Sequence, residues 1–159
     1  METDYKEVVK VKCTPKCKIY TSYFANIKNL EKDGIVPVAI CAMVPSWFDG
    51  VNLGSVAPSK DILFEHKKSA HTKEDDKIYK ERYFNEILVA YRFHPEYIID
   101  FIERVSENNN GKDIALVCYE KPGDFCHRHL LAEWLEERTG VEIKEWGNYV
   151  PDIVSNVLF

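Results

Sequence analysis

The stretch Cys118-Tyr-Glu-Lys-Pro-Gly-Asp-Phe-Cys-His-Arg128 separates two different sequence patterns and decides how the chain folds. Residues 113–117, Asp-Ile-Ala-Leu-Val, form an apolar run that is typical of a strand buried on both faces. Residues 129–139 carry apolar side chains at helical spacing, and Gly140 follows at the expected C-cap. Residues 121–124 predict a turn that ends in an acidic N-cap candidate. The stretch therefore connects a strand to a helix, the place where open α/β sheets bind ligands.

Five polar side chains of this stretch suggest chemistry. Strand alternation predicts that Cys118 and Glu120 lie on the same side. We expect Cys126, His127 and Arg128 in the first helical turn, where unpaired N–H groups and the helix dipole attract anions. A cysteine in such a turn is a candidate thiolate, and the planar guanidinium suits phosphate or carboxylate.

Each of these side chains also has a purely structural interpretation. Both cysteines are candidates for buried packing residues, and Arg128 for an ion pair with Glu120 or Glu133. For a single member of the group this interpretation is the simpler one. For five such side chains within eleven positions at a strand-to-helix junction, a functional site is favoured.

Size and composition limit the possible classes of protein. The chain has 159 residues, a mass of 18.5 kDa and 45% hydrophobic residues, which predicts one domain over residues 1–159 with a sizeable core. A net charge of −5 argues against a broad nucleic-acid-binding surface. The sequence predicts no membrane span and no signal peptide. Five cysteines, an odd number, argue against a disulfide framework and favour reduced thiols in the cytoplasm.

The remaining chain predicts a single-domain α/β fold. Further buried strands are expected at 18–24 and 35–40, and an alternating last strand at 141–146. Helical periodicity predicts one helix from 78 to about 94 and a second that begins at Pro95. This order indicates a mostly parallel sheet flanked by helices, a Rossmann-like three-layer architecture. The mixed-charge residues 65–77 are expected to form a solvated, mobile connection.

Parallel strands bring several further side chains to the predicted site. Ser22 and Tyr23, Cys41, and Cys118 all lie where a strand ends, so we expect them at one edge of the sheet. A loop over residues 44–58 follows the second strand and contains Trp47. This side chain is expected either to stack on a flat ligand or to cover the end of the core.

Taken together, these motifs resemble those of a bacterial and phage family, domain of unknown function 488. The resemblance rests on Cys118-x-Glu120 followed by Cys126-His127-Arg128, and it covers most of the chain. Residues 18–24, the loop after Cys41 and the terminal Glu145-Trp146 are similar to one branch of the family. The resemblance implies a fold and a site, but it implies no reaction and no cofactor.

Three hypotheses about function follow. In the first, an enzyme acts on a phosphorylated or nucleotide-like small molecule, with Cys118 or Cys126 as nucleophile, Glu120 as acid, base or nucleophile, and Arg128 as anion receptor. The further candidates for substrate contact are His127, Cys41, Tyr23, Ser22 and Trp47.

In the second hypothesis, zinc or iron is bound by Cys118, Cys126 and His127, with Cys41 as a possible fourth ligand. In the third, a non-catalytic module binds a nucleotide or a partner protein.

Overall fold

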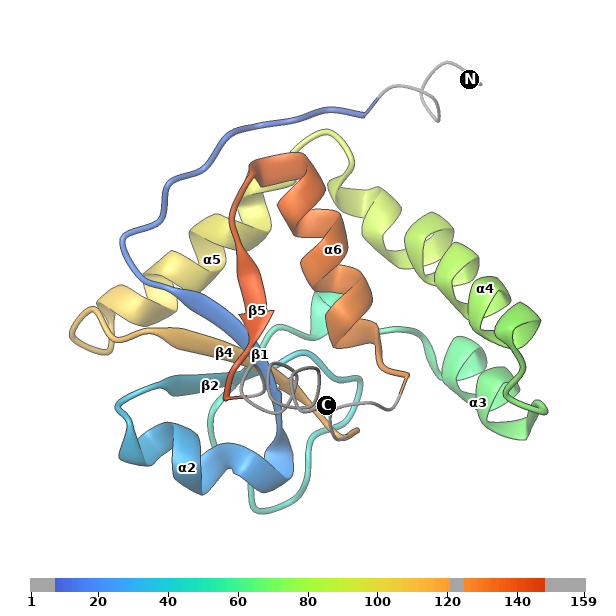
Figure 1. Cartoon of the computed structure of the whole chain (residues 1–159), viewed down its shortest axis with the longest axis horizontal. Coiled ribbons are helices and arrows are strands. Elements are labelled where there is room, and N and C mark those ends of the chain that lie inside the picture. Colours follow the sequence, from blue (N-terminus) through green and yellow to red (C-terminus); the bar gives the residue numbers. More distant parts are fainter. Residues whose placement is uncertain (1–7, 121–124, 148–159) are drawn as a thin grey trace, which may run out of the picture.

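The computed structural model describes residues 8–120 and 125–147, and within them a five-stranded parallel sheet has the order β3-β2-β4-β1-β5 (Figure 1). The predicted turn at 121–124 lies outside the described residues. The strands are β1 (Ile19–Tyr23), β2 (Val36–Ala39), β3 (Val51–Asn52), β4 (Ile114–Cys118) and β5 (Ile143–Glu145). All five residues of β4 are buried, because this strand pairs with β1 and β2 and is covered on both faces.

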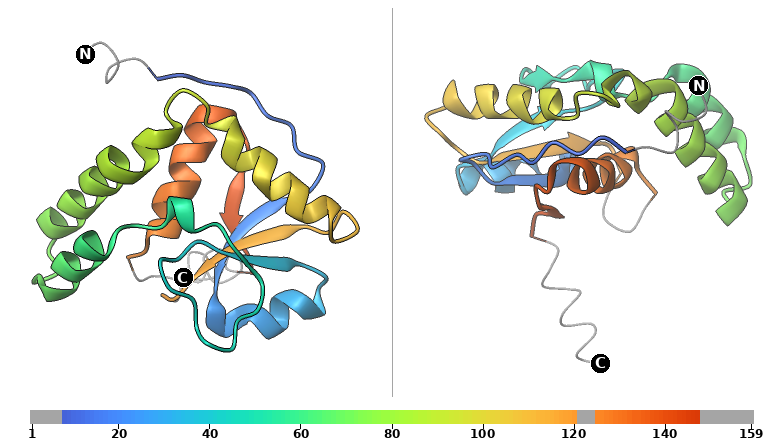
Figure 2. Two further views of the ribbon diagram at one scale, coloured as in Figure 1. Left: turned by 180° about the vertical axis from the view of Figure 1, so that it is seen from behind. Right: turned by 90° about the horizontal axis from the view of Figure 1, so that it is seen from above.

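Helices cover both faces of this sheet, so the predicted three-layer α/β architecture is confirmed. In Figure 2, α5 lies on one face and α6 on the other. The helices of the described chain are α2 (Ile27–Lys32), α3 (Lys60–Lys68), α4 (Lys73–Arg82), α5 (Glu96–Glu107) and α6 (His127–Thr139), with short turns η1 (Phe24–Asn26), η2 (Gly54–Val56), η3 (Tyr83–Ile87) and η4 (Leu88–Tyr91). Across the described ranges, no helix combines the length and apolar character needed to cross a bilayer.

The strands predicted from apolar runs are parallel neighbours, with β4 between β1 and β2. In this register Tyr23 stands opposite Cys118, and Ala39 stands opposite Val117. The carboxyl ends of the three strands therefore meet at one edge, as the sequence predicted.

Two expectations about helices are corrected by the structure. The expected mobile connection at 65–77 is mostly helical, because α3 continues to Lys68 and α4 begins at Lys73. The Ser59 hydroxyl caps the first of these helices, and Thr72 and Asp75 form a capping box on the second. The predicted helix over residues 78–94 is divided instead into the end of α4, the π-helical turn η3 and the 3-10 turn η4.

The end of α6 follows the prediction, whereas its beginning differs. Gly140 adopts φ 74° at the C-cap, a left-handed conformation that suits glycine. Cys126 is the N-cap residue, with extended backbone angles, and the helix begins at His127. Since Cys126 does not continue the helix, its side chain can turn back toward the end of β4.

Candidate functional site

The strand-to-helix junction forms one side of an open cavity of about 800 Å³ at the carboxyl edge of the sheet. One wall comes from the ends of β2 and β4 and from the start of α6. The opposite wall comes from α3 and α4, which Figure 1 shows beside the beginning of α6. Five of the sequence-predicted residues line this cavity: Cys41, Cys118, Glu120, Cys126 and His127.

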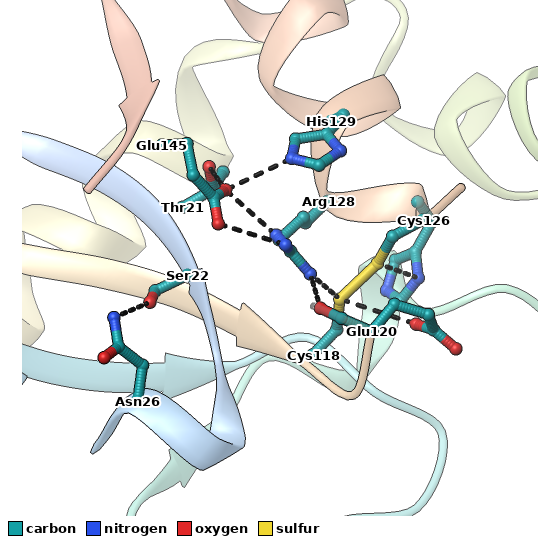
Figure 3. Close-up of polar contacts among 10 residues, drawn as sticks. Thr21, Ser22, Asn26, Cys118, Glu120, Cys126, Arg128, His129 and Glu145 are labelled. Carbon is teal, nitrogen blue, oxygen red and sulfur yellow. Dashed lines mark hydrogen bonds and ion pairs between the residues drawn. A yellow bond between two sulfur atoms is a disulfide. The ribbon is translucent and has the colours of Figure 1, made fainter. Parts of the chain in front are cut away.

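Arg128 lies behind this wall, where its guanidinium is fully buried. Its Nε and Nη2 atoms donate to the two carboxylate oxygens of Glu145 at 3.1 and 3.0 Å. Figure 3 shows Arg128 held between Glu145 on one side and Cys118 on the other. Of the expected carboxylate partners, neither Glu120 nor Glu133 has this role, because β5 brings Glu145 closer. The side chain expected to receive an anion from the cavity is thus engaged by the protein itself.

Glu145 is the acceptor around which this network is built. Its carboxylate also accepts from Thr21 Oγ1 at 2.6 Å and lies 3.1 Å from His129 Nε2. Burial by itself raises the pKa of Glu145, but hydrogen bonds from His129, Arg128 and Thr21 outweigh burial and lower the pKa to about 2. Glu145 is therefore ionised near neutral pH and matches the buried guanidinium.

The remaining donor of Arg128 points toward the sulfur atoms. Its Nη1 lies 3.1 Å from Cys118 Sγ and also donates to the backbone carbonyl of Glu120. A guanidinium donor in this position favours a thiolate over a thiol. The Glu120 carboxylate approaches the same sulfur from the cavity side, with Oε1 3.9 Å from Sγ.

The structure places the sulfur atoms of Cys118 and Cys126 in disulfide contact. This pairing corrects the expectation that all five cysteines are reduced; Cys13, Cys17 and Cys41 are free. The pair forms because the N-cap conformation of Cys126 directs its sulfur to the end of β4. Cys41 is buried and lines the same cavity as the pair, and burial raises the pKa of its thiol to about 11. Cys41 is therefore a protonated neighbour of the site near neutral pH.

His127 has a defined tautomer. Its Nε2 lies 2.6 Å from the carbonyl oxygen of Ile40, which can only accept, so Nε2 carries the proton. The other nitrogen, Nδ1, is 4.0 Å from Cys126 Sγ. Burial lowers the pKa of His127 to about 4, so the ring is neutral and Nδ1 is free of a proton. Ligand atoms of Cys118, Cys126 and His127 all lie within 4.8 Å of one another.

The other sequence-predicted residues lie away from this cavity. Ser22 is buried and accepts a hydrogen bond from Asn26, and the ring of Tyr23 lies 5.8 Å from the Arg128 guanidinium carbon. Trp47 is 61% exposed, packs edge-on against Phe24 and lines a second cavity. Trp47 therefore neither covers the first cavity nor fills the core.

Two groups of functional candidates were missed by the sequence analysis. In the sequence analysis, Glu145 is named only as part of the family resemblance. The alternation of the last strand, however, indicates a half-buried carboxylate at this position. His66 and Asp76 were assigned to a mobile connection, whereas both line the cavity with Nε2 and Oδ1 2.7 Å apart. The capping signals at Ser59 and Thr72 predict the two helices that bring this pair together.

Comparison with known proteins identifies the family of this chain. Residues 35–139 match the family model described as the active DUF488-N3 subclade, DUF488-N3a. The chain belongs to the DUF488 family. No curated protein and no solved structure matches it.

The DUF488 match covers most of the cavity but only part of the charge network behind it. Its range includes the Cys118–Arg128 stretch and the α3–α4 hairpin. Glu145 and Thr21 lie outside the matched residues. The cavity residues thus belong to the shared DUF488 region, whereas the acceptor of Arg128 is supplied by a segment beyond it.

Proposed function

We propose that this DUF488 protein is an enzyme that acts on a phosphorylated or nucleotide-like small molecule in the cavity at the strand-to-helix junction. The observation that carries this proposal is the contact between Arg128 Nη1 and Cys118 Sγ, 3.1 Å apart, at the wall of the cavity. A fully buried guanidinium that donates to sulfur prepares a thiolate for nucleophilic attack.

The neighbouring side chains have complementary roles in this proposal. Cys118, in its reduced form, is the nucleophile, and Glu120 exchanges a proton with the substrate or the leaving group. Cys126 is the second thiol and protects Cys118 as the disulfide when the protein is oxidised. In this proposal the protein lies in the cytoplasm, where the Cys118 and Cys126 thiols would be kept reduced.

The cavity suits a ligand of this class in size and lining. About 800 Å³ falls within the range of roughly 300–1,000 Å³ that small-molecule sites occupy. The aromatic rings of Tyr79, Tyr119 and Phe125 line it together with apolar side chains, and they offer faces for a planar base.

The test is a turnover screen of nucleoside phosphates and sugar phosphates with protein kept reduced by dithiothreitol. We expect Cys118→Ser and Glu120→Gln to lower kcat at least about a hundredfold. Cys13→Ser, which changes a free cysteine outside the cavity lining, is the matched control and should retain activity. Binding of a nucleotide without turnover, unaffected by Cys118→Ser, would instead favour a non-catalytic nucleotide-binding module.

A metal site is the second candidate, and the tautomer of His127 favours it. Histidine ligands usually donate their other N–H to a carbonyl or carboxylate, as Nε2 does to Ile40. Two thiolates and the free Nδ1 would then form a Cys2His ligand set suited to zinc or iron. Cys41 lies outside this group of close ligand atoms among the described residues.

Elemental analysis of reduced, purified protein tests this candidate. One equivalent of zinc or iron that is lost in both Cys126→Ser and His127→Ala would establish the metal site. If the purified protein contains no metal and also fails to bind added zinc, the metal site is ruled out and only the thiolate proposal remains.

A further inference from the structure

The two walls of the cavity differ in charge. The wall built by β4 and α6 presents the Glu120 carboxylate and two sulfurs, and its arginine is buried behind it. Among the described residues that line the cavity, both lysines, Lys60 and Lys67, belong to α3. The Asp76 carboxylate also lines the second wall, but it is held by His66. An anionic ligand is therefore repelled by Glu120 on one wall and attracted by the two lysines on the other.

Helix geometry explains why these lysines face the cavity together. Lys60, Leu63 and Lys67 have the spacing i, i+3 and i+7, which places them within an arc of about 60° on α3. Ile62, on another face of the helix, is buried in the core and fixes this orientation. Within the described chain, no carboxylate forms an ion pair with either lysine, in contrast to Lys80, which pairs with Glu133.

His66 contributes a fixed polar group to the same wall. Its Nε2 lies 2.7 Å from Asp76 Oδ1, and its side chain is only 15% exposed. Ring centroids of Tyr79 and Phe125 lie 5.1 and 5.0 Å from the imidazole. Because Phe125 directly precedes Cys126, this packing connects the α3–α4 hairpin to the sulfur wall.

We infer that the α3 wall, through Lys60, Lys67 and the Asp76-held His66, binds the phosphate group of the ligand and directs its other end toward Cys118 and Glu120. This inference rests on the proposed function and specifies its ligand as a phosphate ester. It also transfers anion recognition from Arg128 to a helix on the opposite side of the cavity. The lysines supply charge. His66 donates one N–H to Asp76 and, in the imidazolium form in which both ring nitrogens are donors, directs the other N–H toward the phosphate.

The experiment measures binding of adenosine 5′-monophosphate, adenosine and inorganic phosphate by isothermal titration calorimetry. The double variant Lys60→Gln/Lys67→Gln is compared with Lys68→Gln/Lys73→Gln, which removes the same charge from the α3–α4 hairpin outside the cavity lining. We expect the first pair to weaken binding of the monophosphate at least tenfold and the second to change it less than twofold. His66→Gln, with an unchanged unfolding midpoint, should weaken it severalfold. Higher salt should reduce binding of the monophosphate to unmodified protein more than to the first double variant.

The outcomes separate this inference from the proposed function. If the monophosphate binds both double variants equally well, the α3 wall is not the phosphate site, although the proposed ligand class stands. If adenosine binds as tightly as the monophosphate, the phosphate has no receptor and the inference fails. If neither phosphate compound binds the unmodified protein, the proposed ligand class fails and the inference with it.

Discussion

Arg128 connects the candidate site to the last strand through two hydrogen bonds to Glu145. Its guanidinium is buried with Glu145, and each side chain has the other as its main counterion. Replacing Arg128 by methionine removes one partner and leaves a buried carboxylate uncompensated, which costs about 3–5 kcal/mol. We therefore expect the free energy of unfolding in urea at pH 7 to fall by that amount.

Lys144→Met is the matched control for this substitution. Lys144 lies beside Glu145 on β5, and both it and its partner Glu142 are exposed, so the change should be about 0.5 kcal/mol or less. A loss of less than about 1 kcal/mol in Arg128→Met would show that the buried pair does not stabilise the fold.

The pH dependence of stability follows from the same carboxylate. Glu145 has a pKa of about 2 when folded and an ordinary value of 4.5. A lowered pKa contributes stability above pH 4.5, and this contribution is lost as the pH falls toward 2. The loss amounts to roughly 3 kcal/mol. In metal-free protein, we expect Glu145→Gln to flatten the pH profile of unfolding between pH 5 and 2.

Glu142→Gln, directly before β5, provides the comparison, since its carboxylate is exposed. Its pH profile should follow that of the unmodified protein. Parallel profiles for unmodified protein and Glu145→Gln would mean that Glu145 titrates alike in the folded and unfolded chain.

At the level of elements, Gly140 ends α6 and turns the chain toward β5. Its φ of 74° strains any residue with a Cβ atom, although no heavy atom lies within 4 Å of where that Cβ would be. We expect Gly140→Ala to cost about 1 kcal/mol through backbone strain alone. Gly54→Ala, at a negative φ and with ordinary contacts, should leave the free energy of unfolding within about 0.5 kcal/mol of that of the unmodified protein. Equal effects of the two substitutions would contradict this explanation.

At the level of the whole molecule, β4 is the strand on which both helix layers depend. Leu116 lies at its centre, fully buried, opposite Thr21 on β1 and Val38 on β2. We expect Leu116→Ala to lower the free energy of unfolding by about 2–5 kcal/mol, because close packing prevents the cavity from collapsing. Leu63→Ala, at a partly exposed side chain on the cavity-facing side of α3, should cost less than about 1 kcal/mol. A small effect of Leu116→Ala would mean that the core repacks to fill the space that the leucine side chain leaves.

Much of the fold was predictable because local patterns carry it. Apolar runs that end at turn residues predicted β1, β2 and β4, and Gly140 predicted the end of α6. The α3–α4 hairpin was not predicted as structure, because charged side chains dominate residues 65–77 and hide a narrow apolar face. Its stability comes from caps and from contacts with distant residues such as Phe125.

The sequence by itself determined that a buried strand meets a helix at Cys118–Arg128, and that parallel strand ends gather there. Those features depend on periodicity and turn chemistry, which act over a few neighbouring residues. Only the tertiary structure decided the partner of each charge. Arg128 pairs with Glu145 and His66 pairs with Asp76 because strands and helices from separate parts of the chain pack together. Ion-pair partners are chosen by distance and burial in three dimensions, and sequence spacing encodes neither.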